Sequence, residues 1–481
     1  MKVSKLSMAF ADGVTRASLA MMFFLAASNT SVAAFSVGPA HKGIQPIGYQ
    51  QLASRLSMTT MKDEEKQERD MEALKGWANQ NGVSVDSDVI SLSNPQGDCW
   101  GFSVPRNSRQ GTTILKVPAS MVINSQQIQD ELSPDHDLSL AIEYLESKNV
   151  HTQIPQFCLF LKLLMEYTKG SDSAWYSWIQ SLPRVFDTAI CMDEVELECL
   201  LPFAWALASV ERLHLEVFQQ TLTMLPKTLA LDPENIQNQE LTMWLFNSVF
   251  TRCWRYPDEV NDKERCDIVP LGDMFNHAPQ NMEIDYDDDG NVIFSLRHDL
   301  AANSPLHLSY GLATNPYRLL VIFGFVDESQ PELFCQIIAS DPSDKLVELG
   351  YDTKKMVFRT QDGAISNAVW DVVLYLILTQ VPQLQEEFYQ AHVDGDKPRK
   401  ATMHAQFRLE ESMFLKNHVQ KCLQEIDVIL EKIKSENESE HPRLGMIRQH
   451  TEFMQRSFRK VHHNLNQTIE SEMEQRRRIQ A

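Results

Sequence analysis

Two strand-like stretches, residues 88–123 and 266–325, lie on either side of a long helical block, and this order limits the folds open to the chain. In the first stretch, residues 113–117 have the β-branched content of a short strand. In the second, strand-like segments flank residues 287–290, whose Asp-Asp-Asp-Gly sequence is typical of a hairpin turn. Strands that stop for helices and then resume predict an α+β core with a helical insertion at about residues 125–255.

A helical pattern dominates the chain after this core. Three segments alternate apolar and charged residues at helical spacing: 364–380, 401–434 and 442–475. Helices of this length predict an all-α lobe at residues 331–481, separate from the strand-containing domain at residues 88–330. Residues 61–87 are expected to form an N-terminal helix and linker, because apolar residues fall on one face of an otherwise charged segment at 62–80.

The first 60 residues have the composition of a targeting segment. Basic residues precede an apolar run at residues 19–27, which is too short to span a bilayer, and small residues follow it. Residues 1–34 are therefore predicted to be a signal peptide. Residues 35–60 contain no Asp or Glu and are rich in Ser, Gly, Pro and Gln, which is typical of transit peptides.

A signal peptide followed by a transit-like segment that begins at Phe35 resembles the bipartite presequence of algae with secondary plastids. This resemblance implies delivery to the chloroplast stroma, with no stable membrane insertion after processing. A secreted protein, or one of the endomembrane lumen, is the alternative.

Charge and cysteine content exclude some classes of protein. The formal net charge of −21 argues against a nucleic-acid binder, because phosphate contacts need a basic surface. An acidic protein suits recognition of a basic peptide. None of the eight cysteines forms a C-x-x-C pair, so the sequence supports neither a zinc site nor a disulfide framework. We expect no metal, and reduced, buried thiols.

The densest set of chemically informative residues lies between 270 and 325. Residues 270–277 read Pro-Leu-Gly-Asp-Met-Phe-Asn-His, and residues 308–315 read Leu-Ser-Tyr-Gly-Leu-Ala-Thr-Asn. With Cys-Trp-Gly-Phe at 99–102 and the Trp-rich segment at 173–183, they resemble the Rubisco large-subunit lysine methyltransferase branch of the SET superfamily. That branch, whose signatures include D-x-x-N-H and a late Tyr-Gly strand, also contains an actin histidine methyltransferase. The resemblance implies a SET β-fold and a C-terminal lobe that binds protein substrates.

The resemblance also implies a binding site for S-adenosylmethionine. The candidate cofactor-binding residues are Asp98, Cys99, Trp100, Gly101, Arg252, Asp273, Asn276, His277 and Tyr310. The amide of Asn276 can donate and accept hydrogen bonds, and the planar fork of Arg252 suits the cofactor's carboxylate. Gly101 allows a close approach of the backbone, and Asp273 can anchor a neighbouring donor.

Methyl transfer requires an aligned acceptor with a free lone pair. By resemblance, Tyr310 is the catalytic residue, with its hydroxyl beside the methyl group, where oxygen acceptors make weak C–H···O contacts. A lysine acceptor must lose a proton, and burial in an apolar channel lowers its pKa. Candidates for lining that channel are Trp254, Tyr256, Phe323 and Phe325. The predicted function is therefore methylation of lysine on a protein substrate.

Two positions depart from the pattern of this branch. Phe323 stands where the plant lysine methyltransferases usually carry Tyr, and the histidine-specific relative also lacks that Tyr. Cys99 replaces the first glycine of G-x-G. Two alternatives therefore stay open: a protein-histidine methyltransferase, and an inactive SET scaffold that binds protein.

Overall fold

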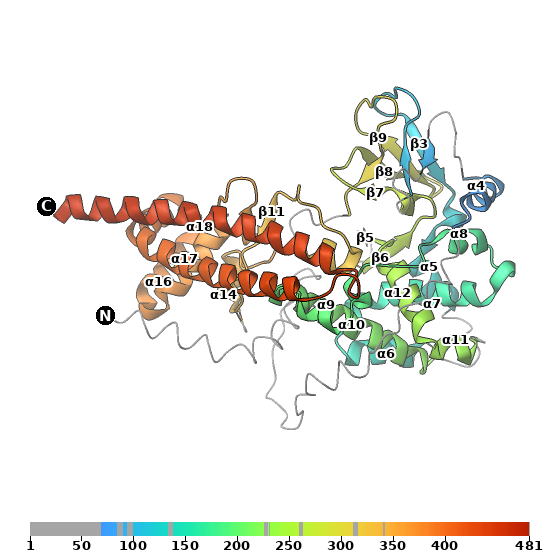
Figure 1. The fold of residues 1–481 in the computed structure, drawn as a ribbon, viewed down its shortest axis with the longest axis horizontal. Helices are drawn as coiled ribbons and strands as arrows, with labels where there is room; N and C mark the ends of the chain where they lie inside the picture. Colours follow the sequence, from blue (N-terminus) through green and yellow to red (C-terminus); the bar gives the residue numbers. More distant parts are fainter. Residues whose placement is uncertain are drawn as a thin grey trace. The chain divides into compact units, whose positions relative to one another are not determined.

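The computed structural model describes most of the chain after residue 68. The described residues are 69–83, 90–93, 100–132, 138–225, 229, 231–258, 263–310, 316–339 and 342–480. The predicted signal peptide and transit-like segment lie outside them, as do Asp98 and Cys99. Figure 1 shows the labelled helices and strands.

The chain divides into two compact units. We call residues 69–186 and 212–310 the strand-rich unit, and residues 187–211 and 316–480 the helix-rich unit. Residues 187–211 and 316–330 thus pack with the C-terminal helices, although both fall within residues 88–330 in sequence. The domain boundaries expected from the sequence stay predictions.

Short strands build the core of the strand-rich unit. They are β1 (Ser91–Ser93), β2 (Gly101–Ser103), β3 (Thr113–Val117), β4 (Ile123–Asn124), β5 (Trp254–Asp258), β6 (Lys263–Ile268), β7 (Asn276–His277), β8 (Met282–Tyr286), β9 (Val292–Leu296) and β10 (His307–Leu308). Two three-stranded sheets have the orders β3-β9-β8 and β4-β6-β5. Strands β1 and β2 pair antiparallel, and β7 and β10 pair in parallel.

The hairpin expected around residues 287–290 is present between β8 and β9. The Asp287 N–H donates to the Asn291 carbonyl over 3.0 Å, and Gly290 has a φ of +78°. The Asp287 carboxylate accepts from the Asn291 side chain and pairs with Lys116, which lowers its pKa. The Asp287 carboxylate of this acidic turn is thus bonded to the neighbouring Asn291 and Lys116 side chains.

Helices fill the interval between β4 and β5, where the sequence predicts an insertion. The helices of this unit are α4 (Met71–Gln80), α5 (Ser125–Leu132), α6 (Ser139–Ser147), α7 (Ile154–Thr168), α8 (Tyr176–Ser181), α11 (Pro233–Gln237) and α12 (Gln239–Phe250), and α10 (Pro202–Leu222) begins in the helix-rich unit and ends here. The insertion has an aromatic core, because Phe157 and Phe160 on α7 lie 5.2 and 5.5 Å from Phe218 on α10.

The helix-rich unit ends in two long helices. Its elements are α9 (Glu194–Glu198), α13 (Pro316–Arg318), β11 (Glu332–Phe334), α14 (Asp344–Glu348), β12 (Val357–Arg359), α15 (Asn367–Ile377), α16 (Pro382–Val393), α17 (Lys397–Ser435) and α18 (Leu444–Gln480). Helices α17 and α18 lie side by side (Figure 1). The buried residues of α17 include Leu415, Val419, Cys422 and Ile426, which share one helical face. The three C-terminal helices expected from periodicity are therefore confirmed as α15, α17 and α18.

One expected strand region is helical instead. Residues 319–325 were expected to be strand-like, but Leu319–Phe323 forms a π-helical segment, η9, directly after α13. A fully apolar run has no period that separates strand from helix, which explains the error. Gly324 ends the segment at a φ of +73°, and a Cβ there would lie 2.6 Å from the Asp187 carbonyl carbon. Only glycine fits this position.

Short 3-10 segments connect several elements: η3 (Ala119–Met121), η4 (His151–Gln153), η5 (Gly170–Asp172), η6 (Ala189–Cys191), η8 (Gly272–Met274) and η10 (Leu378–Gln380). The seven cysteines within the described ranges are free thiols. In the same ranges, no cluster of three or more His, Cys, Asp or Glu is arranged to hold a metal, and no helix has the length and apolar character needed to cross a bilayer.

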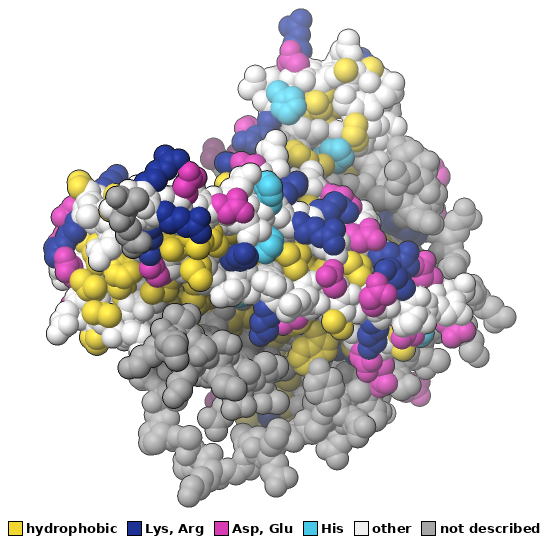
Figure 2. All heavy atoms as spheres, turned by 60° about the vertical axis from the view of Figure 1, so that its left-hand side comes forward, with side chains coloured by type: hydrophobic (Ala, Val, Ile, Leu, Met, Phe, Trp, Pro, Cys, Tyr) yellow, Lys and Arg dark blue, Asp and Glu magenta, His cyan; other side chains and the backbone are white. Residues whose placement is uncertain are grey.

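Charges of both signs are mixed on the surface seen in Figure 2. Arg476 on α18 pairs with Glu410 on α17 at 2.9 Å, and Arg456 on α18 pairs with Glu328, which precedes β11, at 2.5 Å. Among the described residues on this face, basic side chains form no continuous stripe of the kind that follows a phosphate backbone.

Candidate functional site

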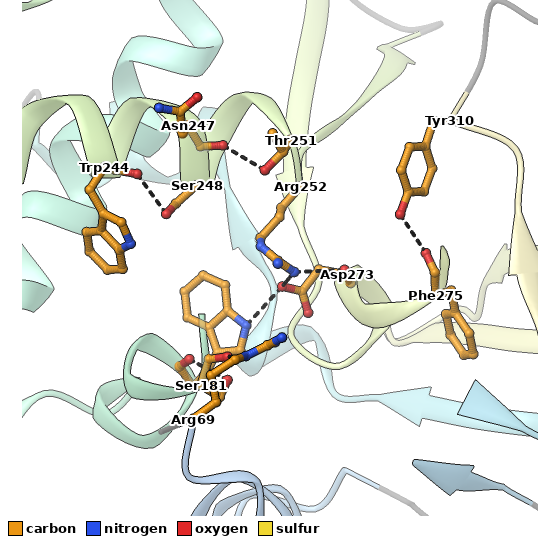
Figure 3. A network of polar contacts seen from close by, with 11 residues as sticks. Arg69, Ser181, Trp244, Asn247, Ser248, Thr251, Arg252, Asp273, Phe275 and Tyr310 are labelled. Carbon is orange, nitrogen blue, oxygen red and sulfur yellow. Dashed lines mark hydrogen bonds and ion pairs between the residues drawn. The ribbon is translucent and has the colours of Figure 1, made fainter. Parts of the chain in front are cut away.

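Arg252 and Asp273 form a buried ion pair in the strand-rich unit. Arg252 follows the C-terminus of α12, and Asp273 lies in η8. Arg252 Nη1 donates to Asp273 Oδ2 and to the Asp273 backbone carbonyl, both over 2.9 Å (Figure 3). The Asp273 side chain is fully buried, and that of Arg252 is 11% exposed. Asp273 therefore does anchor a neighbouring donor, and that donor is Arg252.

The turn that carries Asp273 has an unusual backbone. Leu271 is fully buried and has a φ of +65°, a left-handed conformation that L-residues rarely adopt. Gly272 follows, and a Cβ there would lie 2.5 Å from the Phe294 ring. Strained and crowded backbone often occurs at functional sites. Here the turn places the Asp273 carboxylate within hydrogen-bond distance of Arg252.

Asn276 and Gly101 lie in direct contact, although they are far apart in the sequence. The Asn276 side-chain amide donates to the Trp100 backbone carbonyl over 3.3 Å. A Cβ on Gly101 would lie 2.4 Å from Asn276 Nδ2, closer than real Cβ atoms come. The expected close approach at Gly101 is thus one between two parts of the protein, and it joins the Trp-Gly segment to the Asn-His segment.

Tyr310 points its hydroxyl at the backbone before Asn276. Its Oη donates to the Phe275 carbonyl over 3.0 Å, as Figure 3 shows. The Phe275 ring is buried and packs against Phe102 and Phe294, with centroids 5.0 and 5.1 Å away. The bond to the carbonyl uses the hydroxyl hydrogen, so the tyrosine oxygen takes part in this contact as a donor.

His277 holds the backbone of Tyr310 from the neighbouring strand. The Tyr310 backbone N–H donates to His277 Nδ1 over 3.1 Å, and the two rings lie 5.2 Å apart. His277 acts as an acceptor through this nitrogen, so its neutral form carries the proton on Nε2. Burial, together with the nearby His277, lowers the pKa of His307 on β10.

The four residues proposed for an acceptor channel are divided between the units. Trp254 opens β5 and lies 6.3 Å from Phe294, edge to face, in the strand-rich unit. Tyr256 lies on the same strand, with its side chain outside the described residues. Phe323 and Phe325 belong to the helix-rich unit, where their rings lie 6.3 Å apart around Gly324.

The fold is similar to that of solved Rubisco methyltransferases. A SET domain of LSMT bound to lysine and AdoHcy matches with a TM-score of 0.59 and 17% identity, over 85% of this chain and 95% of that one. A structure of Rubisco LSMT bound to AdoMet gives a TM-score of 0.58 and 18% identity over the same shares. The chain has a SET fold. This confirms the fold class expected from the sequence.

The curated proteins that are similar in sequence are also protein methyltransferases. The ribosomal lysine N-methyltransferase set10 of Schizosaccharomyces pombe is 27% identical over 271 residues, which cover 54% of this chain and 46% of the relative. The actin-histidine N-methyltransferase of Rattus norvegicus is 23% identical over 288 residues, which cover 57% and 45%. The chain thus spans about half the length of the curated relatives that it matches. No family model matches it.

Within the SET fold, seven of the predicted cofactor and catalytic residues each contact another member of the set. They are Trp100, Gly101, Arg252, Asp273, Asn276, His277 and Tyr310. Sequence reasoning missed Trp178, whose indole N–H donates to Asp273 over 3.2 Å. It also missed Phe275, which contributes a backbone carbonyl. A backbone acceptor leaves no signal in residue type. In the sequence, Trp178 stands out only as part of the Trp-rich segment at residues 173–183, and in the structure it is fully buried.

Proposed function

We propose that this chain is an S-adenosylmethionine-dependent methyltransferase that modifies a lysine side chain of a protein. The observation that carries the proposal is the position of Tyr310. Its hydroxyl donates to the carbonyl of Phe275, the residue directly before Asn276, and its backbone N–H donates to His277. A hydroxyl oxygen that donates its hydrogen to a carbonyl still carries lone pairs, which can accept a weak C–H···O contact from a methyl group with positive character. Fixing that group in line with an acceptor supplies much of the acceleration in a displacement.

The residues present fit the proposed cofactor. Arg252 Nη1 is used by Asp273, whereas Arg252 Nε is buried and has no hydrogen-bond partner among the described residues. The Nε and Nη2 groups form the edge of the guanidinium that a carboxylate can accept from in bidentate fashion. When bound, the cofactor supplies an electrophilic methyl on a sulfonium. Arg252 would hold its carboxylate, and backbone groups around Asn276 and His277 would hold the remainder.

A lysine acceptor also needs help from the chain. It must be uncharged to attack, and an aromatic environment disfavours the ammonium form by excluding water. Trp254, whose ring packs edge to face against Phe294 in the strand-rich unit, is the described aromatic residue that we assign to this task. The protein substrate is proposed to bind the C-terminal helices, as the resemblance implies.

Named relatives support lysine as the acceptor. The fission-yeast relative is a ribosomal lysine methyltransferase, and one structural match contains lysine. Histidine is the second candidate, because several sequence relatives are actin-histidine methyltransferases and Phe323 leaves no tyrosine hydroxyl at its position. The two candidates share the cofactor and the role of Tyr310 and differ only in the acceptor.

The deciding experiment is transfer of label from methyl-tritiated S-adenosylmethionine into proteins of a plastid-enriched lysate, followed by mapping of the modified residue. The full chain is compared with Tyr310→Phe, which keeps the ring and removes the hydroxyl. Label on lysine that depends on Tyr310 supports the proposal, and label on histidine replaces it with the second candidate. An absence of both labelling and cofactor binding would leave the inactive scaffold as the better description.

We also propose that the protein works in the chloroplast stroma. The support is the composition of residues 1–60. A fluorescent protein fused behind these residues should accumulate in the plastids of an alga with secondary plastids. Accumulation in the secretory pathway would contradict this location without affecting the enzymatic proposal.

A further inference from the structure

Asp273 is held by a residue from outside its own sequence motif. Trp178 lies on α8, within the helical insertion, and its side chain is fully buried. Its indole N–H donates to Asp273 Oδ2 over 3.2 Å, across a sequence separation of 95 residues. The same oxygen accepts from Arg252 Nη1 over 2.9 Å. One carboxylate oxygen is therefore shared by two donors from two different helical regions.

The bond from Trp178 supplies an orientation that the ion pair alone does not. Both bonds from Arg252 to Asp273 leave from the same nitrogen, Nη1. The terminal torsion of an aspartate is soft, so a single donor nitrogen leaves the carboxylate free to rotate. Asp273 Oδ1 is buried and has no partner among the described residues, so nothing on that side fixes the group. The Trp178 indole N–H restrains the Asp273 carboxylate from a second direction.

We propose that Trp178 is a positioning residue for cofactor binding. It fixes the carboxylate of Asp273, which in turn fixes the guanidinium of Arg252 and keeps its Nε–Nη2 edge available for the carboxylate of S-adenosylmethionine. The inference rests on the proposed function. It assigns to the helical insertion an indirect part in the cofactor site, through the side chains of Asp273 and Arg252.

The expected consequence is a loss that depends on the ligand. Trp178→Phe keeps a buried aromatic ring and removes the N–H. Affinity for S-adenosylhomocysteine, which carries the amino-acid carboxylate, should fall about tenfold, as expected for the loss of a hydrogen bond to a charged group. Affinity for 5′-methylthioadenosine, which lacks that carboxylate, should not change. The KM for S-adenosylmethionine should rise, with kcat at saturation close to that of the unmodified protein.

The chain offers a matched control. Trp244 on α12 is also buried, and its indole N–H donates to the Pro183 carbonyl over 2.8 Å. Trp244→Phe therefore removes an equivalent bond at a position that does not contact Asp273. It should leave the affinity for both ligands unchanged, and any general loosening of the insertion will be seen in both variants.

Isothermal titration calorimetry on the full chain tests the inference. A selective loss of S-adenosylhomocysteine affinity in Trp178→Phe supports it. An equal loss for both ligands, or no loss, overturns it and leaves Trp178 as a core residue. If Trp178→Phe does not fold, Asp273→Asn tests the same link and should show the same selectivity. If the unmodified chain binds neither ligand, the proposed function fails first, and the inference fails with it.

Discussion

A buried charge cluster in the strand-rich unit and one in the helix-rich unit differ in how far their polar atoms are hydrogen-bonded. In the strand-rich unit, Asp273 and Arg252 are paired, but Asp273 Oδ1 and Arg252 Nε are buried without partners among the described residues. In the helix-rich unit, the Asp371 carboxylate accepts from Lys400 and contacts His404, which also contacts Glu411, at 2.7, 3.0 and 2.7 Å respectively. Both ring nitrogens of His404 and both oxygens of Asp371 are thus in use.

The difference distinguishes a candidate binding site, around Asp273, from a charge network that stabilises the fold, around His404. Buried polar atoms without partners cost free energy, so a folded protein that keeps them commonly uses them to bind something. In the Asp371–His404–Glu411 network, Glu411 Oε2 is buried without a hydrogen-bond partner among the described residues, but it lies 4.0 Å from the charged Arg408 Nη1. The network joins the helices that contribute to it, α15 and α17. We therefore expect changes in the Asp371–His404–Glu411 network to affect stability, and changes around Asp273 to affect binding and turnover.

The largest expected effect is on stability. His404→Leu leaves Asp371 and Glu411 as two buried carboxylates without the imidazolium between them. Removing one partner of a buried charge network costs about 3–5 kcal/mol. Urea unfolding of the full chain would measure it. His392→Leu is the control, because His392 lies at the edge of the network, 3.0 Å from Lys400 and 3.9 Å from Asp371, and its loss should cost less. If His404→Leu lowers the free energy of unfolding by less than about 1 kcal/mol, the network does not stabilise the fold as proposed.

Turnover should respond most to Tyr310. Tyr310→Phe removes the oxygen that would fix the transferred methyl group, and a misplaced reacting group costs about 100-fold in kcat. Single-turnover label transfer would measure the change, with the thermal midpoint as a check on folding. Tyr144→Phe, which removes a hydroxyl bonded to Gln220 on the surface, should leave kcat unchanged. Equal rates in the two variants would remove Tyr310 from the mechanism.

A smaller effect is expected at the contact between Gly101 and Asn276. In Gly101→Ala the new methyl would lie 2.4 Å from Asn276 Nδ2, so the amide must move and lose its bond to the Trp100 carbonyl. Loss of one such bond corresponds to about a fivefold to tenfold lower affinity for S-adenosylhomocysteine. Gly76→Ala in α4 is the matched control, since a Cβ there meets nothing within 4 Å. It should bind normally and gain slightly in stability, because alanine favours helix.

The smallest effect is a dependence of stability on pH. Burial disfavours charge on His404, but its bonds to Asp371 and Glu411 outweigh burial and raise its pKa to about 9. Since this pKa lies above the unfolded value of 6.5, the stabilisation is fully present below pH 6.5 and is lost as the pH rises through 9. The thermal midpoint should therefore fall by about 2–4 °C between pH 7 and pH 9.5. His404→Gln should remove this slope, and a slope that persists in that variant would assign the dependence to other groups.

Periodicity and turn chemistry predicted the elements that form from local sequence. The alternation in residues 401–434 gave a single helix, α17, and the Asp-rich turn gave the β8–β9 hairpin. The run at residues 319–323 was predicted incorrectly, because an apolar segment of that length satisfies both periods. Gly324 ends the segment in a left-handed conformation, at a place where the Asp187 backbone leaves no room for a side chain. Tertiary contacts of this kind leave no local pattern.

The residues of the site were predicted from the sequence, but the hydrogen bonds between them were not. Asp273, Asn276 and Tyr310 were named through motif resemblance, which gives identities without hydrogen bonds. The structure adds that Asp273 holds Arg252 and that the Phe275 carbonyl holds Tyr310. The bond from Trp178 could not be predicted, because it joins an insertion helix to a turn 95 residues later and a buried indole is far more often a packing residue.

Leu271 sets a limit on how this protein can be engineered. A left-handed conformation costs an L-residue roughly 1–2 kcal/mol, so a glycine there would relax the backbone. The same exchange would remove a fully buried leucine side chain, at a cost of about 2–5 kcal/mol. Libraries selected for heat tolerance should therefore retain Leu271 despite its strain, and gains in stability should come from positions far from this turn.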